Sequence, residues 1–171
     1  VSYSTLAKPD MGIVNQEQIV ERVKALADAI SIPLIADGDT GFGGECEVKQ
    51  TVELYETGGA SEIQLEDQRF PKRCGHLSGK ELVGGDEMAG KIKAAVEARH
   101  SDEFLVIGRT DARSVSGLEE AIERGRRYVG VGADVLFVES PQNADELRMI
   151  AESFRGVPLM ANMVEGGKTP L

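Results

Sequence analysis

A short stretch near the middle of the chain carries the residue types that proton transfer requires. It begins with the carboxylates at residues 66–67, which directly follow an apolar run and are therefore expected at the end of a strand. Cys74 lies in the same stretch, and its cationic or potentially cationic neighbours are Lys72, Arg73 and His76. Positive charge near a thiol favours the thiolate and lowers the pKa of a cysteine. The stretch therefore predicts a cysteine that exchanges a proton near neutral pH, with a buried, inert cysteine as the alternative.

Acidic side chains elsewhere in the chain could hold a metal ion. Asp37 and Asp39 follow another short apolar run, and their spacing of two residues predicts that both carboxylates leave the strand on the same side. With Glu66 on the neighbouring strand they would form a cluster of oxygen ligands, which suits Mg²⁺ or Mn²⁺ rather than zinc. The alternative is that the two aspartates cap a helix.

Polar residues also follow the other apolar runs. The planar guanidinium of Arg109 can bind a substrate carboxylate through two parallel hydrogen bonds, or it can form a structural ion pair with Asp111 or Glu139. Glu139 and Asn162 are candidates for binding a second carboxylate, a hydroxyl group or Arg109 itself. Their alternative interpretation is ordinary loop polarity.

These side chains need a scaffold that brings the ends of several strands together. Short β-branched runs predict strands that are buried on both faces, as in a parallel sheet covered by helices, at residues 33–36, 62–65, 104–108, 134–138 and 157–161. Apolar residues at helical spacing predict helices around residues 19–30, 48–55, 88–96, 118–122 and 147–154. The chain therefore alternates strands with helices throughout.

Such βα units fit either a doubly wound sheet or part of a (β/α)8 barrel. The chain has no Gly-x-Gly-x-x-Gly turn and no Walker sequence, and a functional group follows each strand, as at the carboxyl face of barrel enzymes. We therefore predict an α/β fold of the TIM-barrel type, in which residues 1–171 form a single partial catalytic domain of about five central βα units. Because a complete barrel has eight units and typically ~250 residues, the chain is interpreted as a fragment, with a non-catalytic structural or regulatory piece as the alternative.

Composition excludes several classes of partner. The net charge of -10 argues against a surface for nucleic acid or for an anionic membrane, both of which need basic residues. No apolar run approaches the ~20 residues of a membrane span. Two cysteines in 171 residues do not make a disulfide framework, so a reducing, cytoplasmic setting is expected.

Several motifs together resemble the isocitrate lyase and phosphoenolpyruvate mutase superfamily. Within it, the chain is most similar to the 2-methylisocitrate lyase and 2,3-dimethylmalate lyase branch, and the resemblance covers essentially the whole chain. The specific markers are at residues 9–12, 37–43, 63–68, 72–76, 109–112 and 162–165, and the Lys-Arg-Cys-Gly-His sequence of residues 72–76 is the most specific of them.

The resemblance implies an α/β barrel that uses Mg²⁺ or Mn²⁺ and, in the whole protein, a homotetramer. It implies that Asp37 touches the metal, that Asp39 and Glu66 hold it directly or through water, and that Asp10 lies in the same shell. The implied location is the cytoplasm, or the mitochondrial matrix in a eukaryote.

The resemblance also implies roles in catalysis. Cys74 would donate a proton to the departing carbanion, and Lys72 and His76 would tune it. The implied substrate-binding residues are Gly75, Arg109, Glu139, Asn162, Met163 and Val164. The implied reaction is carbon–carbon cleavage of a 2-hydroxy di- or tricarboxylate to a 2-oxo acid and a carboxylate, with oxaloacetate decarboxylation or hydrolysis as the alternative. The base that accepts the hydroxyl proton is left open.

Overall fold

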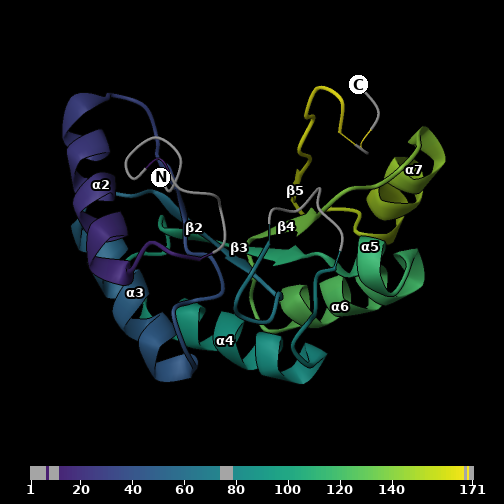
Figure 1. The fold of residues 1–171 in the computed structure, drawn as a ribbon, viewed down its shortest axis with the longest axis horizontal. Helices are drawn as coiled ribbons and strands as arrows, with labels where there is room; N and C mark the ends of the chain where they lie inside the picture. The colour runs from purple at the N-terminus through teal and green to yellow at the C-terminus, as the bar shows by residue number, and fades with distance from the viewer. Residues whose placement is uncertain (1–6, 8–11, 74–78, 168, 170–171) are drawn as a thin grey trace.

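The computed structural model describes residues 7, 12–73, 79–167 and 169, and strands alternate with helices along them (Figure 1). The strands are β1 (Ile35–Asp37), β2 (Glu62–Glu66), β3 (Leu105–Thr110), β4 (Val135–Val138) and β5 (Leu159–Met160). The helices are α2 (Gln16–Ala29), α3 (Glu45–Thr57), α4 (Gly85–Ala98), α5 (Ala112–Val115), α6 (Leu118–Gly130) and α7 (Ala144–Ser153). Every predicted strand and helix is confirmed, and the short helix α5 is an addition.

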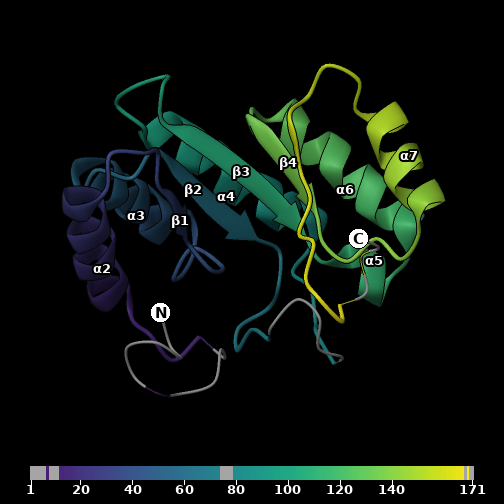
Figure 2. The same ribbon diagram turned by 90° about the horizontal axis from the view of Figure 1, so that it is seen from above.

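The strand order decides between the two predicted architectures. All neighbouring strands are parallel, and the sheet runs β1-β2-β3-β4-β5 in chain order. A doubly wound sheet reverses its strand order at a switch point, whereas a barrel adds each strand beside the previous one. The helices follow the sheet in an arc from α2 to α7 (Figures 1 and 2). The described part of the chain therefore contains five consecutive strands of a barrel, with α2 before the first strand and helices between all of them.

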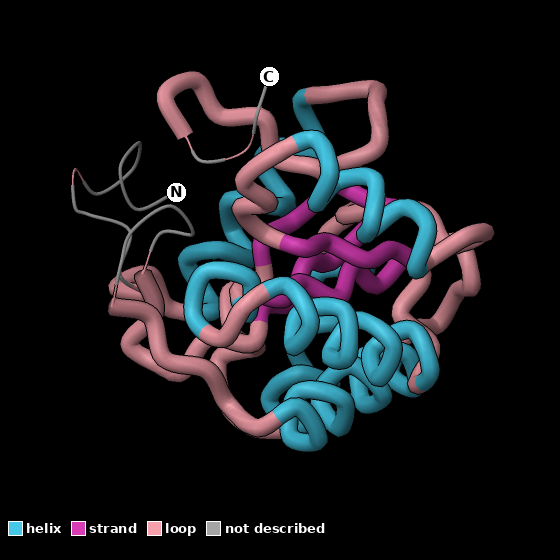
Figure 3. Tube along the Cα trace, turned by 90° about the vertical axis from the view of Figure 1, so that its right-hand side faces the viewer, coloured by secondary structure: helices cyan, strands magenta, loops and turns pink. Residues whose placement is uncertain are grey.

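The helices cover the sheet (Figure 3), and the core lies between these two layers. Fully buried side chains come from both layers and include Val52, Ile63, Leu65, Ile92, Val106, Tyr128 and Leu136. The layers are close at β3, because a Cβ at Gly108 would lie 3.1 Å from Ile92 Cδ1 and 3.3 Å from Tyr128 Cβ. This packing holds the strands rigidly, so their carboxyl ends can position functional groups. No helix in the described segments is long and apolar enough to cross a membrane.

An ion pair joins α5 to α7. Arg113 donates from Nε and Nη2 to the two carboxylate oxygens of Glu146, each at 2.6 Å, and Glu146 Oε2 also accepts the Gln142 backbone N–H at 2.9 Å. The hydrogen bonds from Arg113 hold the pKa of Glu146 below its ordinary value, although burial opposes them. A carboxyl whose folded-state pKa is lowered stabilises the fold above its unfolded pKa, and this contribution is lost as the pH falls through the folded-state pKa.

Glu146→Gln is therefore expected to lower the free energy of unfolding at pH 7 by about 1–2 kcal/mol. At pH 3 the difference from wild type should be smaller, because the contribution of the ion pair is lost as the pH falls toward the folded-state pKa of Glu146. Urea unfolding at both pH values measures the effect. Asp145→Asn is the control, since Asp145 is exposed and pairs only with Arg148 on the same helix face among the described residues. An equal loss at both pH values would contradict this account.

Candidate active site

The turn after β1 carries the first predicted acidic pair. Asp37 ends the strand and is exposed, and its Oδ1 accepts a hydrogen bond from the backbone N–H of Asp39 at 2.9 Å. Asp39 is buried and has φ 46°, so the alternation of the strand does not extend to it and cannot place both side chains as predicted. Gly38 permits this turn to approach β2, because a Cβ there would lie 2.9 Å from the Gln64 carbonyl oxygen.

The capping alternative for these aspartates is not supported. The next helix, α3, begins at Glu45, and its N-cap residue is Gly44. Asp39 instead pairs with Lys72, whose Nζ lies 2.7 Å from Asp39 Oδ1, and both side chains are largely buried. Lys72 was predicted to tune Cys74, and the structure places its ammonium against the acidic turn after β1.

The loop that contains residues 72–76 is anchored at its base. The side chain of Gln68, which is 1% exposed, donates to the Arg73 carbonyl oxygen at 2.8 Å and accepts from the Arg73 N–H at 2.9 Å. The backbone of Val83 then returns to pair with the Asp67 carbonyl oxygen at 3.0 Å. The two ends of the loop therefore stay beside the carboxyl end of β2.

Glu66 has the environment of a buried cation ligand. It ends β2 and is 2% exposed, and its Oε1 has no hydrogen-bond partner among the described residues. Its Oε2 lies 3.4 Å from Arg109 Nη1. Burial raises the pKa of Glu66 to about 8; Arg109 and Lys72 oppose this shift, and Asp111 and Asp37 add to it. A buried carboxylate oxygen without a partner favours a nearby cation.

The donor set fits a hard divalent cation that keeps part of its water shell. Within residues 12–73, 79–167 and 169, no group of three or more His, Cys, Asp or Glu side chains is gathered closely enough to enclose a metal. Mg²⁺ does not need such a cage, because it usually binds through one or two carboxylates and several waters. The open oxygen of Glu66 and the exposed carboxylate of Asp37 are suitable ligands of this type.

Arg109 lies between three carboxylates at the ends of neighbouring strands. Its Nε and Nη2 donate to Asp111 at 3.0 and 3.2 Å, and Nη2 lies 3.5 Å from Glu139 Oε2. The guanidinium carbon also lies 5.1 Å from the centre of the Phe137 ring. Burial alone would lower the pKa of Arg109, but Glu66, Asp111 and Glu139 together raise it above its ordinary value. The group therefore stays cationic, and the structural ion pairs considered from the sequence are present.

The residues predicted to bind substrate are brought together only in part. Glu139 is fully buried directly after β4, and its Oε1 accepts a hydrogen bond from Ser140 Oγ at 2.9 Å. Asn162 is half-buried in the segment after β5, where Met163 and Val164 are exposed. Their contact with substrate stays a prediction.

Four predicted residues lie outside the described part of the chain. They are Asp10, Cys74, Gly75 and His76. Their assigned roles as metal-shell residue, proton donor, substrate-binding backbone and tuning group therefore stay predictions.

A buried polar network beneath the site was not predicted. Asp67 accepts hydrogen bonds from Thr110 Oγ1 at 2.7 Å, Tyr128 OH at 2.8 Å, Asp111 N at 2.9 Å and Arg124 Nη1 at 3.1 Å. Burial raises the pKa of Asp67, and the hydrogen bonds from Asp111, Thr110 and Tyr128 oppose that shift. The network fixes the start of α5 beside the end of β2.

Lys80 was also missed. Its Nζ lies 2.7 Å from Asp111 Oδ1, and the two side chains are 1% and 0% exposed. Nothing in the local sequence distinguishes this lysine from an ordinary surface lysine.

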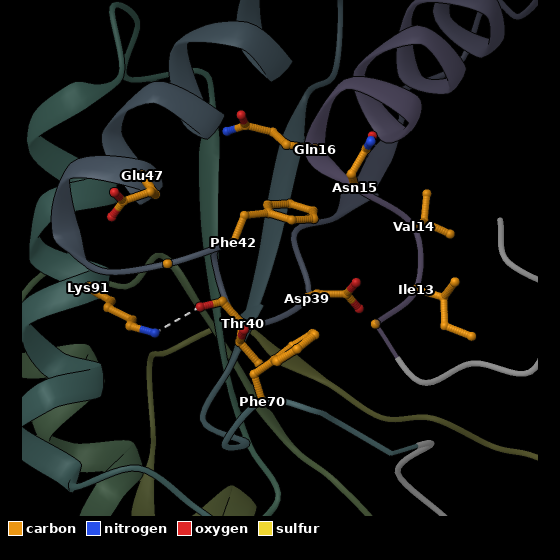
Figure 4. Close-up of a pocket in the computed structure, with 12 residues that line it drawn as sticks. Ile13, Val14, Asn15, Gln16, Asp39, Thr40, Phe42, Glu47, Phe70 and Lys91 are labelled. Atoms are coloured by element: carbon orange, nitrogen blue, oxygen red, sulfur yellow. Dashed lines mark hydrogen bonds between the residues drawn. The ribbon is translucent and has the colours of Figure 1, made fainter.

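A cavity of about 430 Å³ adjoins the acidic turn (Figure 4). It is lined by residues 12–16, Asp39, Thr40, Phe42, Gly43, Glu47, Phe70 and Lys91. Lys91 Nζ donates to the Thr40 carbonyl oxygen at 3.0 Å; burial lowers the pKa of Lys91, whereas Glu87 and Glu47 raise it. Asp39 belongs both to the lining of this cavity and to the candidate site. The cavity therefore gives a small molecule room beside the acidic turn after β1.

Comparison with known proteins identifies similar sequences over almost the whole chain. A model of the phosphoenolpyruvate phosphomutase family matches residues 2–170. The 2,3-dimethylmalate lyase of Eubacterium barkeri is 49% identical over 170 residues, which are 99% of this chain and 58% of that protein. The 2-methylisocitrate lyase of Bacillus subtilis is 47% identical over 162 residues, 95% of this chain and 53% of that protein. The chain therefore spans little more than half the length of these relatives.

Solved structures of similar proteins also align with almost the whole chain and with little more than half of their own length. A crystal structure of 2,3-dimethylmalate lyase aligns with a TM-score of 0.96 and 38% identity, over 99% of this chain and 57% of that one. Oxaloacetate acetylhydrolase with 3,3-difluorooxalacetate aligns with a TM-score of 0.95 and 39% identity, over 99% and 59%. Phosphonopyruvate hydrolase in complex with oxalate and Mg²⁺ aligns with a TM-score of 0.80 and 40% identity, over 92% and 55%.

Proposed function

Because the chain belongs to the phosphoenolpyruvate phosphomutase family, we propose that the whole protein is a Mg²⁺-dependent carbon–carbon lyase. Its substrate is a 2-hydroxy di- or tricarboxylate of the 2,3-dimethylmalate or 2-methylisocitrate type, and its products are a 2-oxo acid and a carboxylate. The observation that carries the proposal is the cluster at the strand ends, where Arg109 lies among Glu66, Asp111 and Glu139. The 49% identity to a 2,3-dimethylmalate lyase supports the choice of reaction.

Four acidic residues would hold the metal ion. Glu66 offers a buried carboxylate oxygen without a partner in the described residues, and Asp37 offers an exposed carboxylate. The backbone of Asp39 adjoins both, because its N–H donates to Asp37 Oδ1 and its carbonyl oxygen accepts from the Glu66 N–H, each at 2.9 Å. Asp10 is assigned to the same shell by the family resemblance. The bound cation, Mg²⁺ or Mn²⁺, would polarise the oxygens of the 2-hydroxy acid. A solved relative contains Mg²⁺, which supports this choice.

Side chains of the cluster would bind the substrate carboxylates. Arg109 supplies the positive charge, and Glu139 holds the guanidinium from one side at 3.5 Å. The backbone at Gly75 and the segment after β5 with Asn162, Met163 and Val164 would complete the binding site. This arrangement orients the carbon–carbon bond that breaks.

Cleavage then needs one proton to leave and one to arrive. Loss of the hydroxyl proton turns the 2-hydroxy carbon into the 2-oxo carbonyl while the adjacent carbon–carbon bond breaks. The electron pair of that bond leaves with the second fragment, which is an enolate-like carboxylate. The Cys74 thiol donates a proton to this carbon, with His76 and Lys72 as its cationic neighbours. No oxidant or reductant is consumed.

Oxaloacetate hydrolysis or decarboxylation is the second candidate. It is favoured by the TM-score of 0.95 to oxaloacetate acetylhydrolase. A panel of 2-hydroxy and 2-oxo diacids, assayed with Mg²⁺ for release of a 2-oxo acid from the former and for loss of oxaloacetate from the latter, separates the two. Release of 2-oxo acid from 2-hydroxy diacids supports the lyase, and turnover of oxaloacetate alone contradicts it.

A homotetrameric assembly and a cytoplasmic location, or a mitochondrial one in a eukaryote, are further parts of the proposal.

The two aspartates after β1 are expected to differ in their effect on metal affinity. Asp37→Ala should abolish Mn²⁺ binding and activity together, because it removes a ligand. Asp39→Ala should weaken Mn²⁺ binding less, because Asp39 already pairs with Lys72 at 2.7 Å and would reach the metal through water. Calorimetric titration with Mn²⁺ measures both. Unchanged Mn²⁺ affinity in both variants would show that this turn does not bind the metal.

A further inference from the structure

One buried ion pair beside the candidate site is not explained by the proposed metal or substrate contacts. Lys80 lies in the loop after β2, and its ammonium contacts the carboxylate of Asp111 at the end of β3 with a separation of 2.7 Å. The two side chains are 1% and 0% exposed. A buried ion pair adds little net stability compared with apolar packing, so its position at a functional site calls for a functional explanation.

The side chain of Asp111 is directed toward Arg109 and not toward the helix that it precedes. Asp111 is the N-cap residue of α5, yet it makes no side-chain capping hydrogen bond. The Ala112 N–H is accepted by Thr110 Oγ1 at 3.1 Å instead. Asp111 Oδ1 and Oδ2 accept from Arg109 Nη2 and Nε, so the carboxylate holds one edge of the guanidinium. The ion pair between Lys80 and Asp111 therefore affects the position of Arg109, which is the group proposed to bind substrate.

The charges around Arg109 show what Lys80 contributes. One guanidinium faces the carboxylates of Glu66, Asp111 and Glu139 at 3.0–3.5 Å. A negatively charged diacid approaching Arg109 would be repelled by such a surplus of carboxylates. Lys80 supplies a second positive charge to this cluster through Asp111. It also shares Asp111 Oδ1 with Arg109, which limits how fully Asp111 neutralises the guanidinium.

We propose that Lys80 is a positioning residue that, through Asp111, orients Arg109 and keeps its positive charge available to a substrate carboxylate. The inference rests on the proposed function, because the binding of a substrate carboxylate by Arg109 is part of that function. Lys80 itself does not touch the substrate in this account. Since Arg109 would hold the carboxylate in both the ground state and the transition state, loss of Lys80 should act mainly on KM.

The test compares Lys80→Met, Lys80→Arg and a matched control in the whole protein loaded with Mg²⁺. The control is Lys93→Met, because Lys93 is exposed on α4 and pairs with Glu97 on the same helix. The readouts are kcat and KM for 2,3-dimethylmalate and the Kd of oxalate, a small dicarboxylate probe, by calorimetry. Lys80→Met should raise KM and the oxalate Kd about tenfold and change kcat less than about threefold. Lys80→Arg should restore both constants, and Lys93→Met should match wild type.

The possible outcomes distinguish a failure of the inference about Lys80 from a failure of the proposed lyase function. Wild-type oxalate affinity in folded Lys80→Met would overturn the inference. Wild-type protein that binds oxalate but cleaves no 2-hydroxy diacid would overturn the proposed function, and the oxalate comparison would still test Lys80. Failure of wild type to bind oxalate would overturn both. If Lys80→Met does not fold, Lys80→Met/Asp111→Asn removes both buried charges, and an unchanged oxalate Kd in that variant would equally overturn the inference.

Discussion

Asp67→Ala is expected to lower the free energy of unfolding by about 3–5 kcal/mol. The carboxylate of Asp67 is fully buried and accepts hydrogen bonds from Thr110, Asp111, Arg124 and Tyr128. Its removal leaves a buried hydroxyl, a phenol and part of a guanidinium without their acceptor. Unsatisfied buried donors carry their full desolvation cost, and Arg124 would keep only one of its two carboxylate partners, Glu120 at 2.8 Å. The network lies under the start of α5, so the loss should also displace Arg109.

Chemical unfolding followed by circular dichroism measures this loss. Asp86→Ala is the matched control, because Asp86 also pairs with an arginine, Arg127 at 2.9 Å, but its side chain is 95% exposed. The control should change the free energy of unfolding by less than about 1 kcal/mol. A loss of similar size for both variants would contradict the structural role assigned to Asp67.

Cys74→Ser in the whole protein is expected to lower kcat for cleavage by more than tenfold while Mn²⁺ affinity is retained. Serine is too weak an acid to replace a thiol that is proposed to exchange a proton near neutral pH. The carboxylates that are proposed to bind the metal lie in other segments, so the substitution should not disturb them. Steady-state kinetics and calorimetric titration give the two quantities.

Cys46→Ser provides the control for the loss of a thiol as such. Cys46 is exposed near the start of α3 and lies outside the proposed site. It should retain wild-type kcat. If Cys74→Ser keeps more than about a tenth of wild-type kcat, the effect is below about 1.4 kcal/mol and Cys74 is not the proton donor.

The sequence was sufficient to predict the arrangement of the strands and helices and one part of the site. Apolar periodicity is a local property, and it located all five strands and every helix between them except the short helix α5. Parallel strands all point the same way, so the polar residue after each strand had to lie at one edge of the sheet. Glu66, Arg109 and Glu139 do meet there.

Pairings across the sheet could not be predicted in the same way. The contacts of Lys80 with Asp111 and of Lys72 with Asp39 depend on how the loop after β2 folds back over the strand ends, and neither partner is near the other in sequence. The position of Asp39 was also beyond a strand-based argument, because the chain leaves the extended conformation after Asp37. Local pattern therefore predicted which segments meet, and tertiary structure determined which side chains pair.

Cleavage of 2,3-dimethylmalate in D₂O with Mg²⁺ tests the central claim most directly, with the products followed by NMR. The account predicts equal amounts of pyruvate and propionate, since the carbon with the hydroxyl becomes the 2-oxo carbon and the other fragment keeps its carboxylate. Each propionate should carry one deuterium on the carbon next to the carboxylate, delivered by the exchanged thiol, and chelation of Mg²⁺ should stop the reaction. No cleavage of 2,3-dimethylmalate or 2-methylisocitrate, together with conversion of oxaloacetate, would contradict the lyase assignment.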